Sequence, residues 1–196
     1  MSSLPAITRT LLFANIGVFV VQYFGGDEII YRFALWPWAT PLFHVWQLVS
    51  YGFLHGSVGH LFFNMFALYM FGPEIERVLG KQRFLNYYLV SVIGAAVMQV
   101  LVMQVMGGAL VPTVGASGGV FGLLLAFGMF FPQRRIMLLI PPIPMKAWVF
   151  VTLYGLIELA MGVFGTQQGV AHFAHLGGML AGFLMLSYWR NRPGLT

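Results

Sequence analysis

The sequence contains no cysteine and few charged residues. Without cysteine the chain forms no disulfide bond, no thiolate metal site and no cysteine nucleophile. Charged residues make up 8% of the chain, against about 25% in a soluble domain, whereas 59% of the residues are hydrophobic and the mean hydropathy is +0.84. The composition therefore indicates a polytopic membrane protein. We interpret the net charge of +5 as cytoplasmic anchoring by Lys and Arg, not as a nucleic-acid-binding surface.

Six apolar stretches predict an all-α membrane protein, a six-transmembrane-helix bundle that forms one domain over residues 1–196. The expected helices cover residues 7–24, 59–71, 84–106, 117–131, 145–164 and 171–189. A helix needs about 20 residues to cross the hydrocarbon core, so the second and fourth are short, although the second could extend toward Glu76. We expect these two helices to begin inside a water-filled protein interior. The first apolar run lacks a convincing cleavage site and is interpreted as a retained helix.

The long segment between the first two expected helices, residues 25–58, is rich in Trp, Tyr and Pro. Aromatic residues of this kind settle at the membrane–water interface. We therefore expect a partly embedded, amphipathic segment, with a plain surface loop as the alternative.

The distribution of Lys and Arg predicts the orientation in the membrane. With the N-terminus inside, nine of the ten Lys and Arg residues lie on the cytoplasmic side, and only Arg32 lies outside. This asymmetry follows the positive-inside rule. Both termini are then cytoplasmic, the uncharged loops 107–116 and 165–170 face outward, and the expected location is the plasma membrane of a prokaryote.

Ser117 lies where an uncharged loop turns into the fourth expected helix, within Gly115-Ala116-Ser117-Gly118-Gly119. Its small neighbours leave flexible backbone and open space around the hydroxyl, which a nucleophile needs if a carbonyl is to reach it. The alternative is a serine that only caps the helix. The string also matches the G-x-S-x-G elbow of soluble hydrolases, but that elbow follows a strand, and none is expected here.

Three other polar residues come out at a depth similar to that of Ser117 when 1.5 Å is counted per helical residue. From the cytoplasmic ends, Ser117 lies about 25 Å up, His60 about 24 Å, His175 about 22 Å and Asn64 about 18 Å. Histidine is the usual general base for serine, and His60, Asn64 and the Ser117 amide can donate to an oxyanion. Each residue alone is equally well explained by helix packing, but together they favour a catalytic site.

No Asp or Glu lies near His175 in the sequence, so we expect a Ser-His dyad and not a triad. Small residues recur at every fourth position on the fourth and sixth expected helices and let helix backbones approach closely. They are Gly118, Gly122 and Ala126, and Ala174, Gly178 and Gly182. If the two stripes face each other, Ser117 and His175 meet at the top of the contact.

A metal site is the weaker interpretation of the histidines. His172 precedes His175 and His55 precedes His60 at short spacing, but there is no His-Glu-x-x-His and no carboxylate among them. Glu158 is the one acid deep in an expected helix, where it could pair with a polar group or border a water pocket. It leaves a proton-coupled or small-solute transporter open as an alternative, although no internal repeat is evident.

At these residues the sequence resembles the rhomboid family of intramembrane serine proteases. Three motifs carry the resemblance in order and spacing: His60-Leu-Phe-Phe-Asn64, Gly115-Ala-Ser117-Gly, and Ala174-His175-Leu-Gly-Gly178. The resemblance extends from the first helix to Arg190. It implies a six-helix core without cofactor or metal, with Ser117 as nucleophile and His175 as base. It also implies an oxyanion hole of His60, Asn64 and the Ser117 amide.

Two further positions are interpreted through the resemblance. Many family members have an aromatic residue one turn after the serine that stacks on the catalytic histidine, and Phe121 fits that position. Many also carry Trp-Arg in the first long loop, where this chain has Trp46-Gln47, so any role of that arginine is absent.

The predicted function is an intramembrane serine endopeptidase that cleaves transmembrane segments of other membrane proteins near their outer ends, within the lipid bilayer. A substrate helix must unwind locally, because a helical backbone hides its carbonyls. The expected entry side is near the fifth helix and the loop 165–170. An inactive rhomboid-like binder of transmembrane segments is the second alternative.

Overall fold

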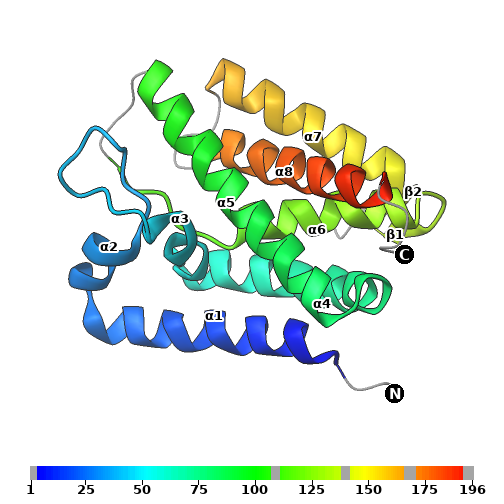
Figure 1. Ribbon diagram of the computed structural model, residues 1–196, viewed down its shortest axis with the longest axis horizontal. Coiled ribbons are helices and arrows are strands. Elements are labelled where there is room, and N and C mark those ends of the chain that lie inside the picture. Colours follow the sequence, from blue (N-terminus) through cyan, green and yellow to red (C-terminus); the bar gives the residue numbers. More distant parts are fainter. Residues whose placement is uncertain (1–3, 107–110, 138–141, 166–170, 192–196) are drawn as a thin grey trace.

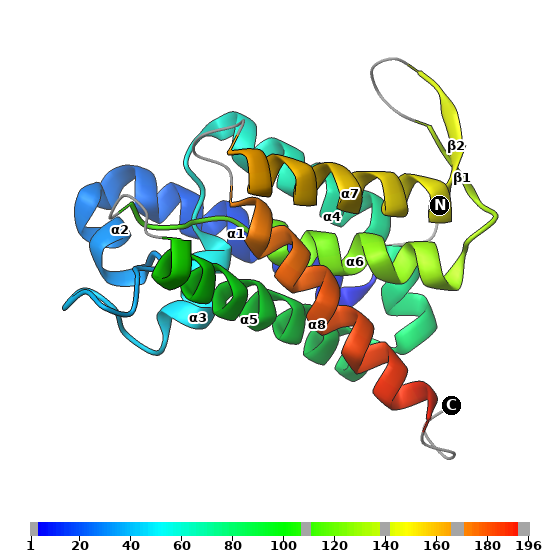
Figure 2. The same ribbon diagram turned by 90° about the horizontal axis from the view of Figure 1, so that it is seen from above.

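The structure is a computed structural model that describes residues 4–106, 111–137, 142–165 and 171–191 (Figure 1). Its described elements are, in order, α1 (Ala6–Gly25), α2 (Asp27–Phe33), α3 (Gln47–Ser50), η1 (Tyr51–Phe53), α4 (Val58–Leu79), α5 (Lys81–Met106), α6 (Ser117–Phe130), β1 (Arg135–Met137), β2 (Pro144–Lys146), α7 (Ala147–Phe164) and α8 (His172–Arg190). The long helices lie alongside one another in two views (Figures 1 and 2). The predicted all-α membrane fold is confirmed, and each of the six expected helices is present.

Three described helices are long and apolar enough to cross a membrane on their own. They are Ala6–Gly25, Lys81–Val105 and Ala147–Phe164, and the shorter α6 is also apolar. Large side chains such as Phe13, Phe24, Leu156 and Phe164 are exposed along α1 and α7. Exposed apolar surface of this extent is suited to lipid.

Helix α4 includes the possible extension expected from the sequence and runs slightly beyond it. The expected helix covered residues 59–71 with an extension toward Glu76, and the observed helix runs through Pro73 to Leu79, with Gly80, whose φ is 76°, as its C-cap. The extra turns have a structural purpose, because the buried Glu76 carboxylate accepts the N–H groups of Ile7 (3.0 Å) and Thr8 (2.7 Å). A helix N-terminus has unpaired N–H groups and a partial positive charge, so Glu76 fixes the start of α1 against α4.

Helix α5 packs against both α6 and α8 and changes the expected packing of the small residues. A side chain on Gly178 would overlap the Gly118 carbonyl, so α6 and α8 do approach closely there. Side chains on Gly118 and Gly122, however, would meet Ala95 and Ser91 of α5 first. The two stripes therefore form a three-helix contact with α5, and not the simple two-helix contact predicted from the sequence.

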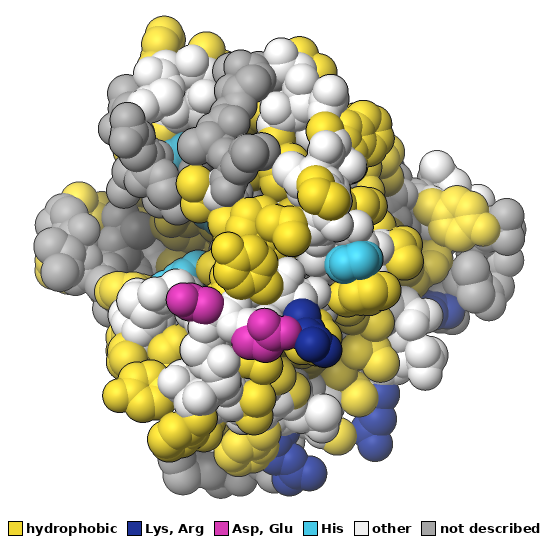
Figure 3. Space-filling view, turned by 90° about the vertical axis from the view of Figure 1, so that its left-hand side faces the viewer, with side chains coloured by type: hydrophobic (Ala, Val, Ile, Leu, Met, Phe, Trp, Pro, Cys, Tyr) yellow, Lys and Arg dark blue, Asp and Glu magenta, His cyan; other side chains and the backbone are white. Residues whose placement is uncertain are grey.

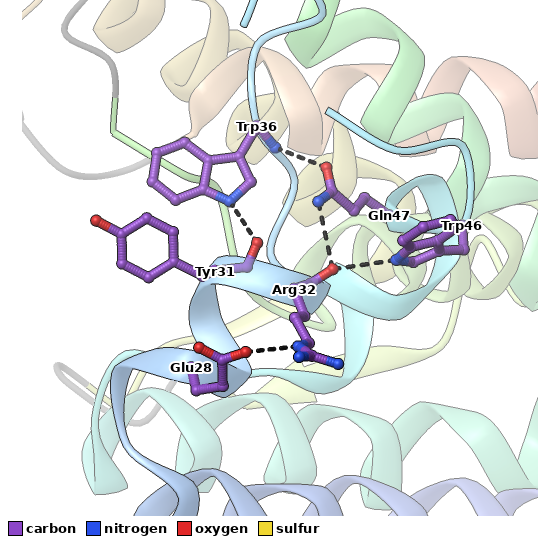
Figure 4. Close-up of polar contacts among 6 residues, drawn as sticks. All are labelled: Glu28, Tyr31, Arg32, Trp36, Trp46 and Gln47. Carbon is purple, nitrogen blue, oxygen red and sulfur yellow. Dashed lines mark hydrogen bonds and ion pairs between the residues drawn. The ribbon is translucent and has the colours of Figure 1, made fainter. Parts of the chain in front are cut away.

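The segment before α4 is organised by Gln47, which is fully buried. Its side-chain oxygen accepts the N–H of Trp36 (3.3 Å), and its amide nitrogen donates to the carbonyl of Arg32 (3.3 Å). Trp46 donates its indole N–H to the same carbonyl (3.0 Å; Figure 4). A buried amide requires such partners. Gln47 therefore holds the segment together.

This organised segment positions the loop that precedes Ser117. Leu35 and Thr113 exchange both backbone hydrogen bonds, at 3.0 and 2.9 Å. The N–H of Gly115 donates to the Tyr51 carbonyl (3.0 Å), and the Tyr51 hydroxyl donates to the carbonyl of Val92 on α5 (2.8 Å). The backbone at the start of α6 is thus held by residues far away in the sequence.

Most of the basic residues gather toward one end of the bundle. The antiparallel hairpin β1–β2 pairs Arg135 with Lys146, and Arg134 forms an ion pair with Glu74 of α4 (3.1 Å). The start of α1 and the end of α8 lie toward the same end (Figure 1). At the opposite end α2 carries Asp27, Glu28 and Arg32, and the view onto that end shows hydrophobic side chains around acidic and basic ones (Figure 3). Within the outer loops that the sequence predicts, residues 107–110 and 166–170 lie outside the described residues.

Candidate active site

Ser117 is the first residue of α6 and does not cap that helix. The residue at the N-cap position is Ala116, and no side-chain cap hydrogen bond is present there. The Ser117 hydroxyl instead lies 2.8 Å from Nε2 of His175. A serine oxygen at this distance from an imidazole nitrogen has the arrangement of a nucleophile and its base.

His175 lies in the first turn of α8 and is held on two sides. The ring of Phe121 stacks on it, with centroids 4.2 Å apart and planes inclined by 6°. Its second nitrogen, Nδ1, lies 2.8 Å from a carboxylate oxygen of Glu158 on α7. Helix α6 therefore contributes two contacts to this imidazole, Ser117 and Phe121, and α7 contributes one, Glu158.

The carboxylate beside His175 corrects the prediction of an isolated dyad. Sequence reasoning expected no acid there because none is close along the chain, but packing of α7 on α8 brings Glu158 to it. Nδ1 of His172 lies 2.7 Å from the same Glu158 oxygen. The three side chains are 4–9% exposed, so the cluster is shielded from solvent within the described structure.

The same cluster weakens the sequence argument against a metal, since Glu158 supplies the carboxylate that the histidines lacked. The donor atoms of Glu158, His172 and His175 lie within 4.8 Å of one another. The two nitrogen–oxygen distances of 2.7 and 2.8 Å are, however, shorter than the roughly 3.3 Å between two ligands of a tetrahedral zinc ion. Both are distances of hydrogen bonds.

His60 lies on the other side of Ser117, near the start of α4. A Cβ atom on Gly115 would come within 2.9 Å of His60 Nε2 and 3.6 Å of the Ser117 hydroxyl oxygen. Nδ1 of His60 accepts the backbone N–H of Gly56 (3.3 Å). An imidazole that accepts at Nδ1 carries its proton at Nε2 when neutral. His60 is thus a hydrogen-bond donor that faces the space beside Ser117.

Asn64 lies one turn after His60 on the same face of α4. Its amide nitrogen donates to the His60 carbonyl (3.0 Å), and the side chain is buried. The second amide proton remains for another acceptor. The N–H of Ser117 is in the first turn of α6, where backbone donors have no partner within the helix. Three donor groups therefore come from the starts of α4 and α6.

His55, in the turn before α4, lies against His60. The ring centroids of His55 and His60 are 5.1 Å apart, and the ring centroid of Phe19 on α1 lies 6.4 Å from that of His55. Burial, followed by the proximity of His60, lowers the pKa of His55 to about 4. His55 is therefore neutral at neutral pH and places no positive charge beside His60.

Residues 42–192 match the Rhomboid domain. The chain belongs to the rhomboid family. It is 33% identical over 142 residues to mitochondrial Rhomboid protein 1 of Saccharomyces cerevisiae, and 36% identical over 140 residues to RHOMBOID-like protein 4 of Arabidopsis thaliana. It is 29% identical over 189 residues to Rhomboid protease GlpG of Photorhabdus laumondii.

These rhomboid relatives are longer than the chain. The matches cover 70%, 71% and 95% of this chain, but only 40%, 33% and 62% of the yeast, plant and Photorhabdus proteins respectively. The family assignment accounts for the arrangement of the three sequence motifs at one end of a helical membrane bundle.

Sequence reasoning missed two residues of this rhomboid site. Gly115 has a φ of 133°, a value that favours glycine, and its missing side chain leaves room for His60. The sequence shows a glycine two residues before the serine, but it does not show that His60 lies against that glycine. Glu158 stands out in the sequence as a lone acid within an apolar helix, a position that is functional by default. Its contacts with His172 and His175 could not be derived from the sequence.

Proposed function

We propose that this rhomboid-family chain is an intramembrane serine endopeptidase that hydrolyses peptide bonds in or near transmembrane segments of other membrane proteins. The observation that carries the proposal is the 2.8 Å contact between the Ser117 hydroxyl and Nε2 of His175. Rhomboid protease GlpG of Photorhabdus laumondii, which matches 95% of this chain, is a protease by name. This similarity supports the same activity.

The chemistry begins with attack of the Ser117 oxygen on a substrate carbonyl carbon. His175 accepts the hydroxyl proton at Nε2 as the new C–O bond forms, and it later delivers this proton to the leaving amine as the C–N bond breaks. Water then hydrolyses the acyl-enzyme by the same route. Phe121 holds the imidazole in plane through both steps.

The negative oxygen of the tetrahedral intermediate is assigned to the side of Ser117 that faces His60. The donors are Nε2–H of His60, the side-chain amide of Asn64 and the N–H of Ser117. Such preorganised donors are more effective in a low-dielectric site than in water. Gly115 leaves the space in which this oxygen and the His60 ring meet.

The proposed orientation has both termini in the cytoplasm and the site toward the outer surface. It rests on the cations, since basic residues such as Arg134, Arg135 and Lys146 lie at the end of the bundle away from Ser117. A substrate helix enters beside α7 and unwinds there. The plasma membrane of a prokaryote stays a prediction, and the relatives include a mitochondrial and a plant protein.

The transporter alternative loses its main support from the position of Glu158. This acid was the residue proposed to carry a proton, and its carboxylate is already engaged by two histidines. The inactive binder is not favoured by any contact of the described residues, because the Ser117–His175 pair is intact.

The proposal is tested by labelling the purified protein with a fluorophosphonate probe and by cleavage of a model transmembrane substrate. We expect label on Ser117, and loss of both label and cleavage in Ser117→Ala. His175→Ala should lose cleavage equally, and the double variant should be no worse, because residues that act as a unit are non-additive. Ser91→Ala, which alters another buried serine, is the control that should keep both. Label at another serine, or cleavage by Ser117→Ala, would refute the proposal.

A further inference from the structure

Glu158 is a buried acid in a helix that otherwise buries little. The buried residues of α7 are Ala147, Val151 and Glu158, and Glu158 is 4% exposed. Removing an ionised carboxylate from water is costly unless hydrogen bonds or opposite charge compensate. Its partners, His172 and His175, lie in the first turn of α8. Within the described part of the chain, the hydrogen bonds that offset the cost of burying this acid come from the active-site candidate His175 and from its neighbour His172.

Both histidines present the same nitrogen to the same oxygen. Nδ1 of His172 and Nδ1 of His175 lie 2.7 and 2.8 Å from Oε2 of Glu158. An ionised carboxylate only accepts hydrogen bonds, so each Nδ1 carries a proton. A neutral His175 then has its lone pair at Nε2, the atom that faces Ser117. The carboxylate thus selects the one tautomer in which His175 can accept the serine proton.

We propose that Glu158 is a positioning residue for the Ser117–His175 pair, which sets the tautomer and the orientation of His175. The inference rests on the proposed peptidase function. When Nε2 takes the serine proton, His175 becomes an imidazolium that keeps its Nδ1 proton and donates it to Glu158, which stays ionised. No proton passes to the carboxylate. The acid fixes the tautomer and orientation of the base and lies against the positive charge that forms during the reaction.

His172 acts one step further from the chemistry. Its Nδ1–H gives Glu158 a second donor, which holds the carboxylate in place and supports its ionised form. Its other nitrogen, Nε2, is buried without a hydrogen-bond partner among the described residues. His172 is therefore not in contact with Ser117 and does not act as the base. Its contribution is one charge-assisted hydrogen bond to the acid.

The test compares Glu158→Gln with the unchanged protein in detergent, by steady-state cleavage of a transmembrane substrate and by the rate of fluorophosphonate labelling. Gln keeps the shape of Glu and can place its amide oxygen where Oε2 meets both Nδ1–H groups, but it cannot carry the negative charge. Replacement of the acid by its amide costs ~10⁴ in kcat in a Ser-His-Asp protease. We expect kcat to fall at least ~10²-fold here, with KM nearly unchanged and labelling slowed in parallel.

Two comparisons separate positioning from a purely structural role. Glu76→Gln changes another buried hydrogen-bonded carboxylate, away from Ser117, and should lower the melting temperature without this loss of kcat. His172→Ala should lose about tenfold or less in kcat, the value of one such hydrogen bond. His172→Asn should restore much of that loss, because its amide N–H can replace Nδ1–H.

The outcomes distinguish the two proposals. If Ser117→Ala abolishes cleavage and Glu158→Gln keeps kcat within about threefold of the unchanged protein, the peptidase function stands and the positioning role of Glu158 is wrong. A folded Glu158→Gln protein whose loss appears only in KM, with normal labelling, also overturns the positioning role. Cleavage that survives Ser117→Ala refutes the proposed function itself, whatever Glu158→Gln does.

Discussion

Gly115→Ala gives a sharp test of the oxyanion site, because it alters the space between His60 and Ser117 without removing either residue. The added Cβ would lie 2.8 Å from Cε1 and 2.9 Å from Nε2 of His60. Carbon atoms of a folded protein pack at about 3.5–4.0 Å, so the His60 ring has to move by several tenths of an ångström or more. The move takes Nε2–H away from the space beside the Ser117 hydroxyl.

The expected magnitude has a kinetic and a structural part. Loss of one oxyanion donor costs ~10²–10³ in kcat, and KM should change little, because the oxyanion exists only in the transition state. Gly115 also has a φ of 133°, where a residue with a side chain is strained by roughly 1–3 kcal/mol. For a chain of this size each kcal/mol lowers the melting temperature by about 2–4 °C.

The assay measures substrate cleavage, fluorophosphonate labelling and thermal unfolding of the same preparation. Gly59→Ala is the matched control, since it adds the same methyl group next to His60 in the sequence, 3.9 Å from the nearest neighbouring atom, the Ser57 hydroxyl oxygen. That control should keep normal kcat. A Gly115→Ala protein with normal kcat would refute the assignment of His60 as a donor beside Ser117.

Three further predictions concern α4, the α6–α8 contact and the orientation. Asn64→Ala should lower kcat ~10²–10³-fold with KM nearly constant, and a rise in KM with kcat intact would assign Asn64 to substrate binding or packing. Gly178→Ala should lower the melting temperature and slow labelling of Ser117, because its Cβ would overlap the Gly118 carbonyl. Gly17→Ala, whose Cβ meets nothing within 4 Å, should do neither. Equal stability of the two variants would contradict the close approach of α6 and α8. A reporter inserted after Gly165 should read as external and one at the C-terminus as cytoplasmic, and the reverse would overturn the orientation.

The sequence was sufficient for the helices and for the candidate residues. Helix positions follow from the apolar runs, because a membrane requires each backbone polar group to be satisfied within the span. Ser117, His175, His60 and Asn64 are rare polar residues in such runs, and their shared depth follows from the fixed rise per residue. These are local properties, so they could be derived without knowing which helix touches which.

The partners of these residues were determined only by the tertiary structure. Glu158 lies on a different helix from His175, and its distance to Nδ1 depends on how α7 packs on α8. The small-residue stripes predicted close helix packing, but a small residue can pack against any neighbouring helix. The stripes therefore could not reveal that Gly118 and Gly122 pack against α5. The contact of Glu76, near the end of α4, with the N–H groups at the start of α1 likewise depends on how these two helices pack.

The roles of Gly115 and Gln47 show the same division between local pattern and long-range contact. A glycine before the serine indicates an unusual backbone, yet the atom that forbids a side chain belongs to His60 on another helix. Gln47 is an ordinary polar residue in the sequence, and its hydrogen bonds to Trp36 and Arg32 exist only because the segment folds back on itself. The sequence by itself determined which residues are available for chemistry; the packing of helices from distant parts of the chain decided which of them meet, because hydrogen bonds act over a few ångströms.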